Sequence, residues 1–286
     1  MPTPIRVRAD RCPGVRRPWQ ADDGMLVRLR LIGGRVAADE LVAVSEVAQR
    51  YGDGYVHLTS RANLQVRGLP GEDGALAPEV LVALETTGLL PTRSHELVRN
   101  VLVSPQSGLD AGLGSGRADL RPVAAELDRL LRSEPLLATL PGRFLFVLDD
   151  GRGDLISRGC DLGLVALDAE TAQLRIGDDW GSIVPLDTAA STIVALAMMF
   201  SWRRGEGPDA PWHVVELLEP LLAPTPPDPR LPDARGPLPY GEVPGGRHVE
   251  IPDGLLDRAL VDELAGTAPT LIVTPWRGVL IPQENR

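Results

Sequence analysis

The same order of predicted elements occurs near the start of the sequence and again at its end. Residues 23–70 are typical of an apolar strand, a glycine turn, an amphipathic helix and a second strand. Residues 247–282 follow the same order, with a helical segment between two apolar strands. Units of this kind bury their apolar faces against one another in layers. The repetition predicts two half units with pseudo-twofold symmetry, and arginines near matching places in both predict an anionic ligand held between them.

The residues between the two half units predict a middle lobe of mixed strands and helices. Buried strands are expected at 144–149, 160–167 and 173–176, and amphipathic helices at 122–133 and 188–202. After these elements the chain becomes too rich in proline and glycine for regular structure and is typical of a linker. The predicted α+β protein divides into a first half domain (1–71), a middle α/β lobe (72–219), a linker (220–246) and a second half domain (247–286).

The composition excludes several classes of partner. With 29 basic and 39 acidic residues the formal charge is −10, which disfavours non-specific binding to nucleic acid or to an anionic membrane. The longest apolar helix candidate, 189–200, is too short to cross a bilayer. Two cysteines, Cys12 and Cys160, form no disulfide framework. We therefore expect a cytoplasmic protein.

Every basic residue is arginine, and the sequence contains no lysine. Codon bias is a sufficient explanation of this composition. Its chemical consequence is that no site can use a titratable lysine amine, whereas guanidinium groups can bind carboxylates or phosphates through two parallel hydrogen bonds.

Two polar strand segments of the first half unit are candidates for such binding. Arg28 and Arg30 are two residues apart on one strand, so their side chains share a face. Arg61, Gln65 and Arg67 have the same parity in the following strand. If the two strands are neighbours, these side chains form one patch suited to an oxyanion. The alternative is a solvated face of an antiparallel sheet, and the residues alone leave both interpretations open.

The same residues resemble a known family. Residues 24–68 resemble the ferredoxin-like half domain of the nitrite and sulfite reductases, with a Leu-Arg-x-Arg-Leu-x-Gly-Gly strand and turn before a Leu-Thr-x-Arg-x-x-x-Gln strand. The Arg99-Asn100-Val101 segment and the Leu140 to Phe144 segment are similar to later motifs of the family. Cys12-Pro13-Gly14-Val15 and the closing Thr-Pro-Trp-Arg-Gly segment resemble the branch that contains precorrin-3B synthase of cobalamin biosynthesis.

The resemblance implies two ferredoxin-like half units around the middle lobe, with a siroheme-like or precorrin tetrapyrrole as ligand. It also implies a role for individual residues. The implied catalytic residues are Arg28, Arg99 and Arg143, and the implied cofactor-binding residues are Thr59, Arg61, Gln65 and Asn100.

The sequence departs from the family pattern at the active-site lysines and at the cysteines that bind the iron–sulfur cluster. Arg143 and Leu145 stand where the reductases have lysines, so multi-electron reduction of sulfite or nitrite is not expected. The family's 4Fe-4S cluster uses four cysteines after the second half domain, and this sequence stops at Arg286 without them. Three hypotheses follow: an oxidoreductase that obtains a cluster or electrons from a partner protein, a cluster-free tetrapyrrole-binding or degenerate paralogue, and a truncated gene.

The remaining polar residues predict no metal site. The four histidines lack the spacing of metal ligands, although His57 leads into the Arg61 segment and is a candidate ligand contact. Asp149 and Asp150 are expected to cap or form a turn. The late unit keeps Thr274 and Arg277 but is otherwise apolar, so we expect it to act as a packing partner.

Overall fold

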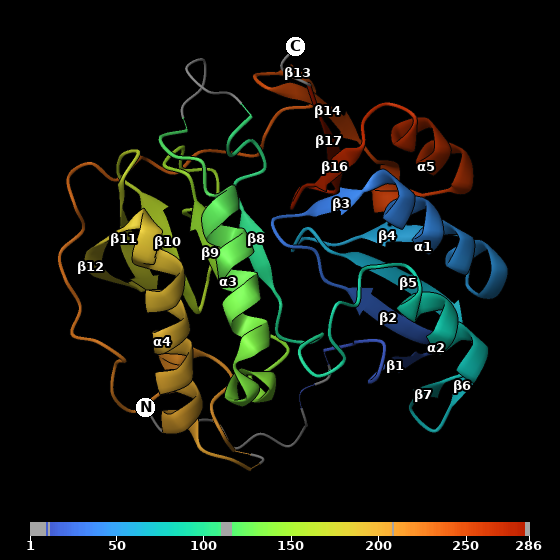
Figure 1. Cartoon of the computed structure of the whole chain (residues 1–286), viewed down its shortest axis with the longest axis horizontal. Coiled ribbons are helices and arrows are strands. Elements are labelled where there is room, and N and C mark those ends of the chain that lie inside the picture. Colours follow the sequence, from blue (N-terminus) through green and yellow to red (C-terminus); the bar gives the residue numbers. More distant parts are fainter. Residues whose placement is uncertain (1–9, 11, 110–115, 208, 284–286) are drawn as a thin grey trace. The chain divides into compact units, whose positions relative to one another are not determined.

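The computed structural model describes residues 10, 12–109, 116–207 and 209–283. The chain divides into two compact units (Figure 1). We call residues 12–97 together with the chain from Leu238 onward the terminal unit, and residues 98–237, which include Asp10 from the start of the chain, the central unit. The division between Leu97 and Val98 lies later than the boundary at residue 71 expected from the sequence, because the helix at 78–85 packs within the terminal unit.

The terminal unit contains two five-stranded antiparallel sheets. Strands that are equivalent in the two repeats occupy equivalent positions in the two sheets. The first has the order β1-β2-β5-β4-β15. Its strands are β1 (Trp19–Ala21), β2 (Gly24–Leu29), β5 (Leu64–Leu69), β4 (Val56–Leu58) and β15 (Leu255–Leu256). The second has the order β13-β14-β17-β16-β3. Its strands are β13 (Gly241–Val243), β14 (Gly246–Glu250), β17 (Gly278–Pro282), β16 (Thr270–Val273) and β3 (Arg35–Ala37).

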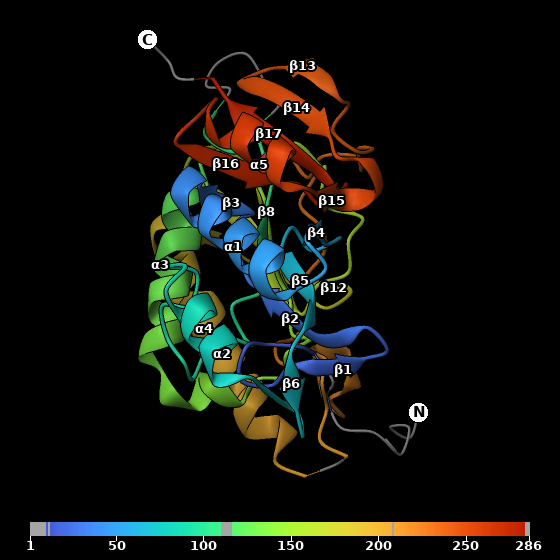
Figure 2. The same ribbon diagram turned by 90° about the vertical axis from the view of Figure 1, so that its right-hand side faces the viewer.

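Each repeat contributes one short strand to the sheet formed mainly by the other repeat. β15 comes from the late repeat and pairs with β4, whereas β3 comes from the early repeat and pairs with β16. Helices α1 (Ala38–Tyr51) and α5 (Arg258–Ala265) occupy equivalent places in the two repeats and pack against each other (Figure 2). The predicted pair of half units is therefore confirmed, and the exchanged strands join them into one folded unit.

Shorter elements complete the terminal unit. Helix α2 (Pro78–Glu85) contacts α1 and follows a small hairpin of β6 (Gly71–Glu72) and β7 (Ala75–Leu76). A 3-10 turn, η3 (Pro252–Gly254), precedes β15. Buried apolar residues of α1 at helical spacing, Leu41, Val44, Val47 and Ala48, form the side that packs on the unit.

The central unit is a mixed sheet with helices α3 (Arg121–Ser133) and α4 (Leu186–Arg204). The sheet order is β12-β11-β10-β9-β8, in which β8, β9 and β10 are parallel and the remaining neighbours are antiparallel. The strands are β8 (Val101–Val103), β9 (Phe146–Asp149), β10 (Leu162–Ala166), β11 (Thr171–Ile176) and β12 (Asp179–Pro185). Two 3-10 turns are η1 (Pro135–Thr139) and η2 (Val214–Glu216).

Aromatic side chains join the sheet and α4 at the centre of this unit. The ring centroid of Phe144 lies 5.2 Å from that of Phe146 and 4.9 Å from that of Phe200. All three side chains are fully buried. The strands and helices expected here from the sequence are thus present, and β8 and β12 are two additional edge strands.

The segment predicted as a linker lacks helix and strand up to Tyr240, but much of it is bonded to the central sheet. Thr225 N donates to Trp180 O at 2.8 Å, and the Gln173 side chain bonds to Pro226 O and Asp228 N. Proline limits the regular structure of this segment, while these contacts fix its path. Within the described part of the chain, no helix combines the length and the apolar character needed to cross a membrane.

Candidate anion-binding site

The polar face of the first sheet of the terminal unit gathers several of the predicted site residues. On β2, Val27 and Leu29 are fully buried and lie opposite Val66 and Leu64 of β5, so they form the apolar face of the sheet. Arg28 alternates with them and lies directly opposite Gln65. Because successive side chains of a strand point to opposite faces, the arginine and the glutamine share the other face.

This polar row continues across the sheet to a third strand. His57 of β4 is the cross-strand partner of Gln65 on its other side. The His57 ring nitrogen Nε2 lies 2.7 Å from Asp53 Oδ2, which orients the ring. The row His57, Gln65, Arg28 therefore offers an imidazole, an amide and a guanidinium to one surface.

A tight turn holds Arg61 at the start of β5. Thr59 N donates to Asn63 O, Asn63 N donates to Thr59 Oγ1 at 3.1 Å, and Ala62 adopts a left-handed backbone with φ of 54°. Asn63 Oδ1 also accepts from Leu31 N at 2.9 Å, which ties the turn to the end of β2. The hydroxyl of Thr59 thus serves the turn, and the turn brings Arg61 toward the arginines of β2.

Arg28, Arg30 and Arg61 form a cluster of mutually repelling cations, which we call the arginine cluster. Burial, followed by repulsion from Arg28 and Arg61, lowers the pKa of Arg30 to about 10. Burial and repulsion from Arg61 also lower the pKa of Arg28. The Arg28 Nε atom is buried and has no hydrogen-bond acceptor among the described residues. Such a concentration of buried positive charge is stabilised by an anion.

The other predicted site residues belong to the central unit, where each has a local contact. Arg99 is buried and its Nε donates to Asp128 Oδ1 at 2.6 Å, a charge pair that positions α3. Asn100 Nδ2 donates to Gly142 O and Phe144 O. Arg143 is half exposed, and its guanidinium lies 5.1 Å from the centre of the Trp212 ring.

The structure therefore brings together four of the seven predicted residues in the terminal unit: Arg28, Thr59, Arg61 and Gln65. The sequence placed Arg30 on the same face without including it in the predicted site, and Asn63 was missed. The spacing of Thr59 and Asn63 was the available signal, since a hydroxyl four residues before an amide can close such a turn.

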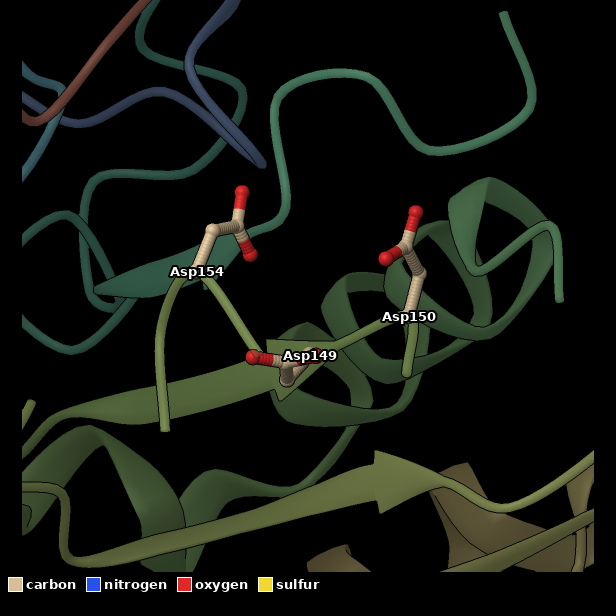
Figure 3. Close-up of side chains that lie close together, drawn as sticks. All are labelled: Asp149, Asp150 and Asp154. Atoms are coloured by element: carbon tan, nitrogen blue, oxygen red, sulfur yellow. The ribbon is translucent and has the colours of Figure 1, made fainter. Parts of the chain in front are cut away.

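A second polar cluster lies in the central unit, where Asp149, Asp150 and Asp154 approach one another (Figure 3). One carboxylate oxygen of each lies within 4.8 Å of the others. Asp149 accepts hydrogen bonds from the backbone of Gly151, Gly153 and Leu155, as expected for a residue that forms a turn.

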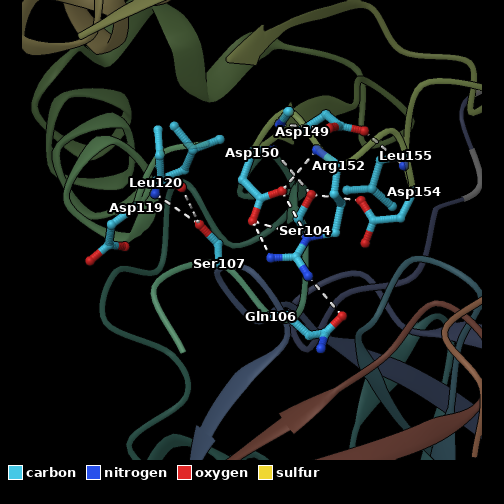
Figure 4. Close-up of polar contacts among 12 residues, drawn as sticks. Ser104, Gln106, Ser107, Asp119, Leu120, Asp149, Asp150, Arg152, Asp154 and Leu155 are labelled. Atoms are coloured by element: carbon cyan, nitrogen blue, oxygen red, sulfur yellow. Dashed lines mark hydrogen bonds and ion pairs between the residues drawn. The ribbon is translucent and has the colours of Figure 1, made fainter. Parts of the chain in front are cut away.

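The neighbours of this aspartate cluster are shown in Figure 4. Arg152 Nη2 donates to Asp150 Oδ2 at 2.6 Å, and its Nη1 donates to Gln106 Oε1. Ser104 Oγ donates to Asp154 Oδ1 at 2.7 Å. Burial and the charge of Asp149 raise the pKa of Asp154 to about 7. Because amides and a guanidinium already bind two of the three carboxylates, the arrangement serves to shape the loop after β9.

Comparison with known proteins agrees with the geometry of the terminal unit. A model of the nitrite/sulfite reductase ferredoxin-like half domain matches residues 20–77, which contain β2, the Thr59–Asn63 turn and β5. A precorrin-3B synthase from a Sinorhizobium species is 27% identical over 199 residues, covering 70% of this chain and 36% of that protein. The chain is similar to proteins of the nitrite/sulfite reductase family.

A named nitrite reductase and a solved structure are also similar to this chain. A ferredoxin–nitrite reductase from Synechococcus elongatus is 34% identical over 134 residues, covering 46% of this chain and 26% of that protein. The solved structure of the NirA protein of Mycobacterium tuberculosis superposes with a TM-score of 0.67 and 18% identity, over 93% of this chain and 57% of that chain. The chain therefore shares the fold of this neighbour, and it spans between 26% and 57% of the length of these relatives.

Proposed function

We propose that the arginine cluster, with Gln65 beside it, binds the carboxylates of a siroheme-like or precorrin tetrapyrrole. The observation that carries the proposal is the mutual repulsion of three guanidinium groups, on β2, just after β2 and in the turn before β5, one of which has a buried Nε without an acceptor among the described residues. Planar guanidinium groups pair with carboxylates through two hydrogen bonds, and a tetrapyrrole carries several carboxylates. For Arg99, Asn100 and Arg143 of the central unit we propose the roles that the resemblance implies for them.

The proposed activity is that of an oxidoreductase resembling precorrin-3B synthase. Its support is the match to a precorrin-3B synthase over 70% of the chain. Relatives named ferredoxin–nitrite reductase support a further proposal, that an electron-donor protein is a partner. Related reductases carry siroheme and a 4Fe-4S cluster, and a bound siroheme would supply redox chemistry.

The residues of this chain fit a tetrapyrrole and do not fit a 4Fe-4S cluster. The arginine cluster suits the carboxylates of a tetrapyrrole. Cluster ligation needs four thiolates, whereas the sequence contains Cys12 and Cys160, one in each unit. The cysteines of this sequence therefore do not suffice to hold such a cluster.

A second candidate function is cluster-free tetrapyrrole binding without redox chemistry. It is favoured by Leu145, which is buried and apolar at the place where the resemblance implies a second lysine. A buried leucine can neither donate a proton nor attract an anionic substrate.

Two measurements test the proposed function. The visible spectrum and iron content of protein purified without air distinguish a siroheme enzyme from a colourless binder. Titration with uroporphyrin, followed by its absorbance, tests binding directly. We expect Arg28→Met to weaken uroporphyrin binding by about 10- to 100-fold, the value of a hydrogen bond to a charged group. Arg67→Met removes the same charge from the same sheet, but Arg67 pairs with Asp23 of the turn between β1 and β2, so binding should be retained. Equal loss in both variants would exclude a specific role for the cluster.

A further inference from the structure

A cleft lies in the central unit at the turn between β11 and β12. Its volume is about 240 Å³, and it is lined by residues of the β11–β12 hairpin, of η2 and of the chain between Leu217 and Leu222. All of these residues belong to the central unit. A concave site with an apolar lining and a few polar groups is the usual form of a small-molecule site.

The η2 turn forms one wall of the cleft and is held in place. Val214 N donates to Asp161 Oδ1 at 3.0 Å, which anchors the turn. Gly177, with φ of 62°, lies between β11 and β12 and lets η2 approach the hairpin. A Cβ at Gly177 would lie 2.6 Å from the Val215 side chain.

The chain after η2 forms another wall. Arg203 Nη1 of α4 donates to Pro220 O at 2.9 Å, and Thr225 N donates to Trp180 O at 2.8 Å. Leu221 is buried. Because both walls are fixed by their own contacts, a ligand can bind the cleft without first ordering these segments.

Trp180 adds aromatic surface to the cleft. The indole is half-buried, and the guanidinium carbon of its cross-strand partner Arg175 lies 5.8 Å from the ring centroid. Val215, which also lines the cleft, is 60% exposed. An indole beside open apolar surface favours a ligand with an apolar or aromatic body.

Asp178 and Asp179 give the cleft its charge. Both residues are exposed, and neither carboxylate forms a hydrogen bond or an ion pair with another described residue. The residues that line the cleft include no arginine. Two unpaired carboxylates beside an indole attract an organic cation through ionic and cation–π interactions.

We propose that this cleft binds a small organic cation in which an ammonium or guanidinium group is attached to an apolar body. An apolar cavity of about 150 Å³ holds benzene. A cleft of about 240 Å³ therefore has room for an aromatic ring with a short cationic side chain. None of the residues proposed to bind the tetrapyrrole lines the cleft, so this proposal does not depend on the proposed function.

Three probes with the same phenyl group and different charges test the proposal on the full chain. At neutral pH 2-phenylethylamine is a cation, 2-phenylethanol is neutral and 3-phenylpropionate is an anion. Their affinities are measured by NMR titration of the Trp180 indole N–H signal, which is assigned with Trp180→Phe.

We expect 2-phenylethylamine to bind with a Kd on the order of 1 mM, as is typical of a ligand of this size. It should bind at least about fivefold more tightly than 2-phenylethanol, and this preference should shrink as salt is added. The anion should bind most weakly. Equal affinities for the amine and the alcohol, or no saturable change of the Trp180 signal, overturn the proposal.

Charge removal then tests the two carboxylates. Asp178→Asn and Asp179→Asn, each alone, should weaken binding of the amine about two- to fivefold and leave binding of the alcohol unchanged. Glu170→Gln is the matched control, because it removes an exposed carboxylate just before β11, at the end of that strand away from the cleft. Circular dichroism checks the folding of each variant. If Glu170→Gln weakens amine binding as much as the two aspartate variants, the attraction is not specific to the cleft and the proposal is overturned.

Discussion

The early and late repeats of the terminal unit contain the same turn with different side chains. In the early repeat Thr59 N bonds to Asn63 O, and in the late repeat Thr274 N bonds to Gly278 O at 2.9 Å. The threonine hydroxyl accepts from the last amide of its turn in both cases, at 3.1 and 3.2 Å. The fourth residue is left-handed in both, Ala62 with φ of 54° and Arg277 with φ of 61°.

This equivalence corrects the expectation that the arginines of the two repeats match. Arg277 occupies the left-handed position of Ala62, and the counterpart of Arg61 is Trp276. A one-residue offset in such a turn changes which side chain is presented to the sheet face. The late turn therefore presents an indole where the early turn presents a guanidinium.

The strand pairs that follow the two turns also carry different side chains. Two residues after the early turn Gln65 lies opposite Arg28, and two residues after the late turn Leu280 lies opposite His248. His248 Nε2 lies 3.0 Å from Thr274 Oγ1, and the ring of Tyr240 lies 4.7 Å from the imidazole ring. The late repeat fills its own polar face, while the early repeat gathers cations on it. Shared backbone geometry thus does not imply a shared function.

The largest expected effect is on the stability of the late turn. A Cβ at Gly278 would overlap His248 Nε2 and lie 2.8 Å from Val249 O. Gly278→Ala should lower the free energy of unfolding by about 3 kcal/mol, the upper range for overpacking of a filled site. Urea denaturation measures this loss, and Asn63→Ala in the early turn is the comparison. If the free energy of unfolding of Gly278→Ala equalled that of the wild type, His248 would not fill the polar face of the late repeat.

The next effect distinguishes the repeats by binding. Arg61→Met should weaken uroporphyrin binding by about 10-fold or more, because a charge-assisted hydrogen bond is lost. Trp276→Leu changes the equivalent position of the late turn and should leave the affinity unchanged. Both variants are compared by absorbance titration. Similar losses in the two variants would contradict the assignment of binding to the early repeat.

A smaller difference is expected for the two threonines. Thr274 is fully buried and bonds to both His248 and Gly278, whereas Thr59 is partly exposed. Thr274→Val should cost about 1–3 kcal/mol of stability, because buried partners lose a hydrogen bond. Thr59→Val should cost less, since water can replace its hydroxyl. Thermal denaturation measures the stability that each variant loses. A larger loss of stability for Thr59→Val than for Thr274→Val would contradict this prediction.

The smallest effect is a pH dependence of the late repeat. Burial lowers the pKa of His248 below its ordinary value of 6.5. The stability that comes from neutral His248 is present above pH 6.5 and is lost as the pH falls from there toward the folded-state pKa. Urea midpoints of the wild type should fall over this window more steeply than those of His248→Gln. Parallel curves would show that the imidazole is free to protonate in the folded protein.

The sequence predicted the parts of the site that follow from local periodicity. Strand alternation predicted that Arg28 and Arg30 share a face; the structure has Arg28 on β2 opposite Gln65, while Arg30 follows the end of that strand. The sequence did not predict that Arg99 would pair with Asp128, because that contact joins the segment before β8 to the middle of α3. Nor did it reveal that β3 and β15 are exchanged between the sheets, since short strands gain their hydrogen bonds from residues distant in the chain.

The sequence by itself determined that the chain repeats a strand, helix and strand unit and that its cations are guanidinium groups. These properties depend on residue type and on spacing within one element. Only the tertiary structure decided which repeat gathers charge and which fills itself. The reason is physical: cross-strand register and the left-handed turn position decide whether a side chain meets a cation, an imidazole or a packed neighbour.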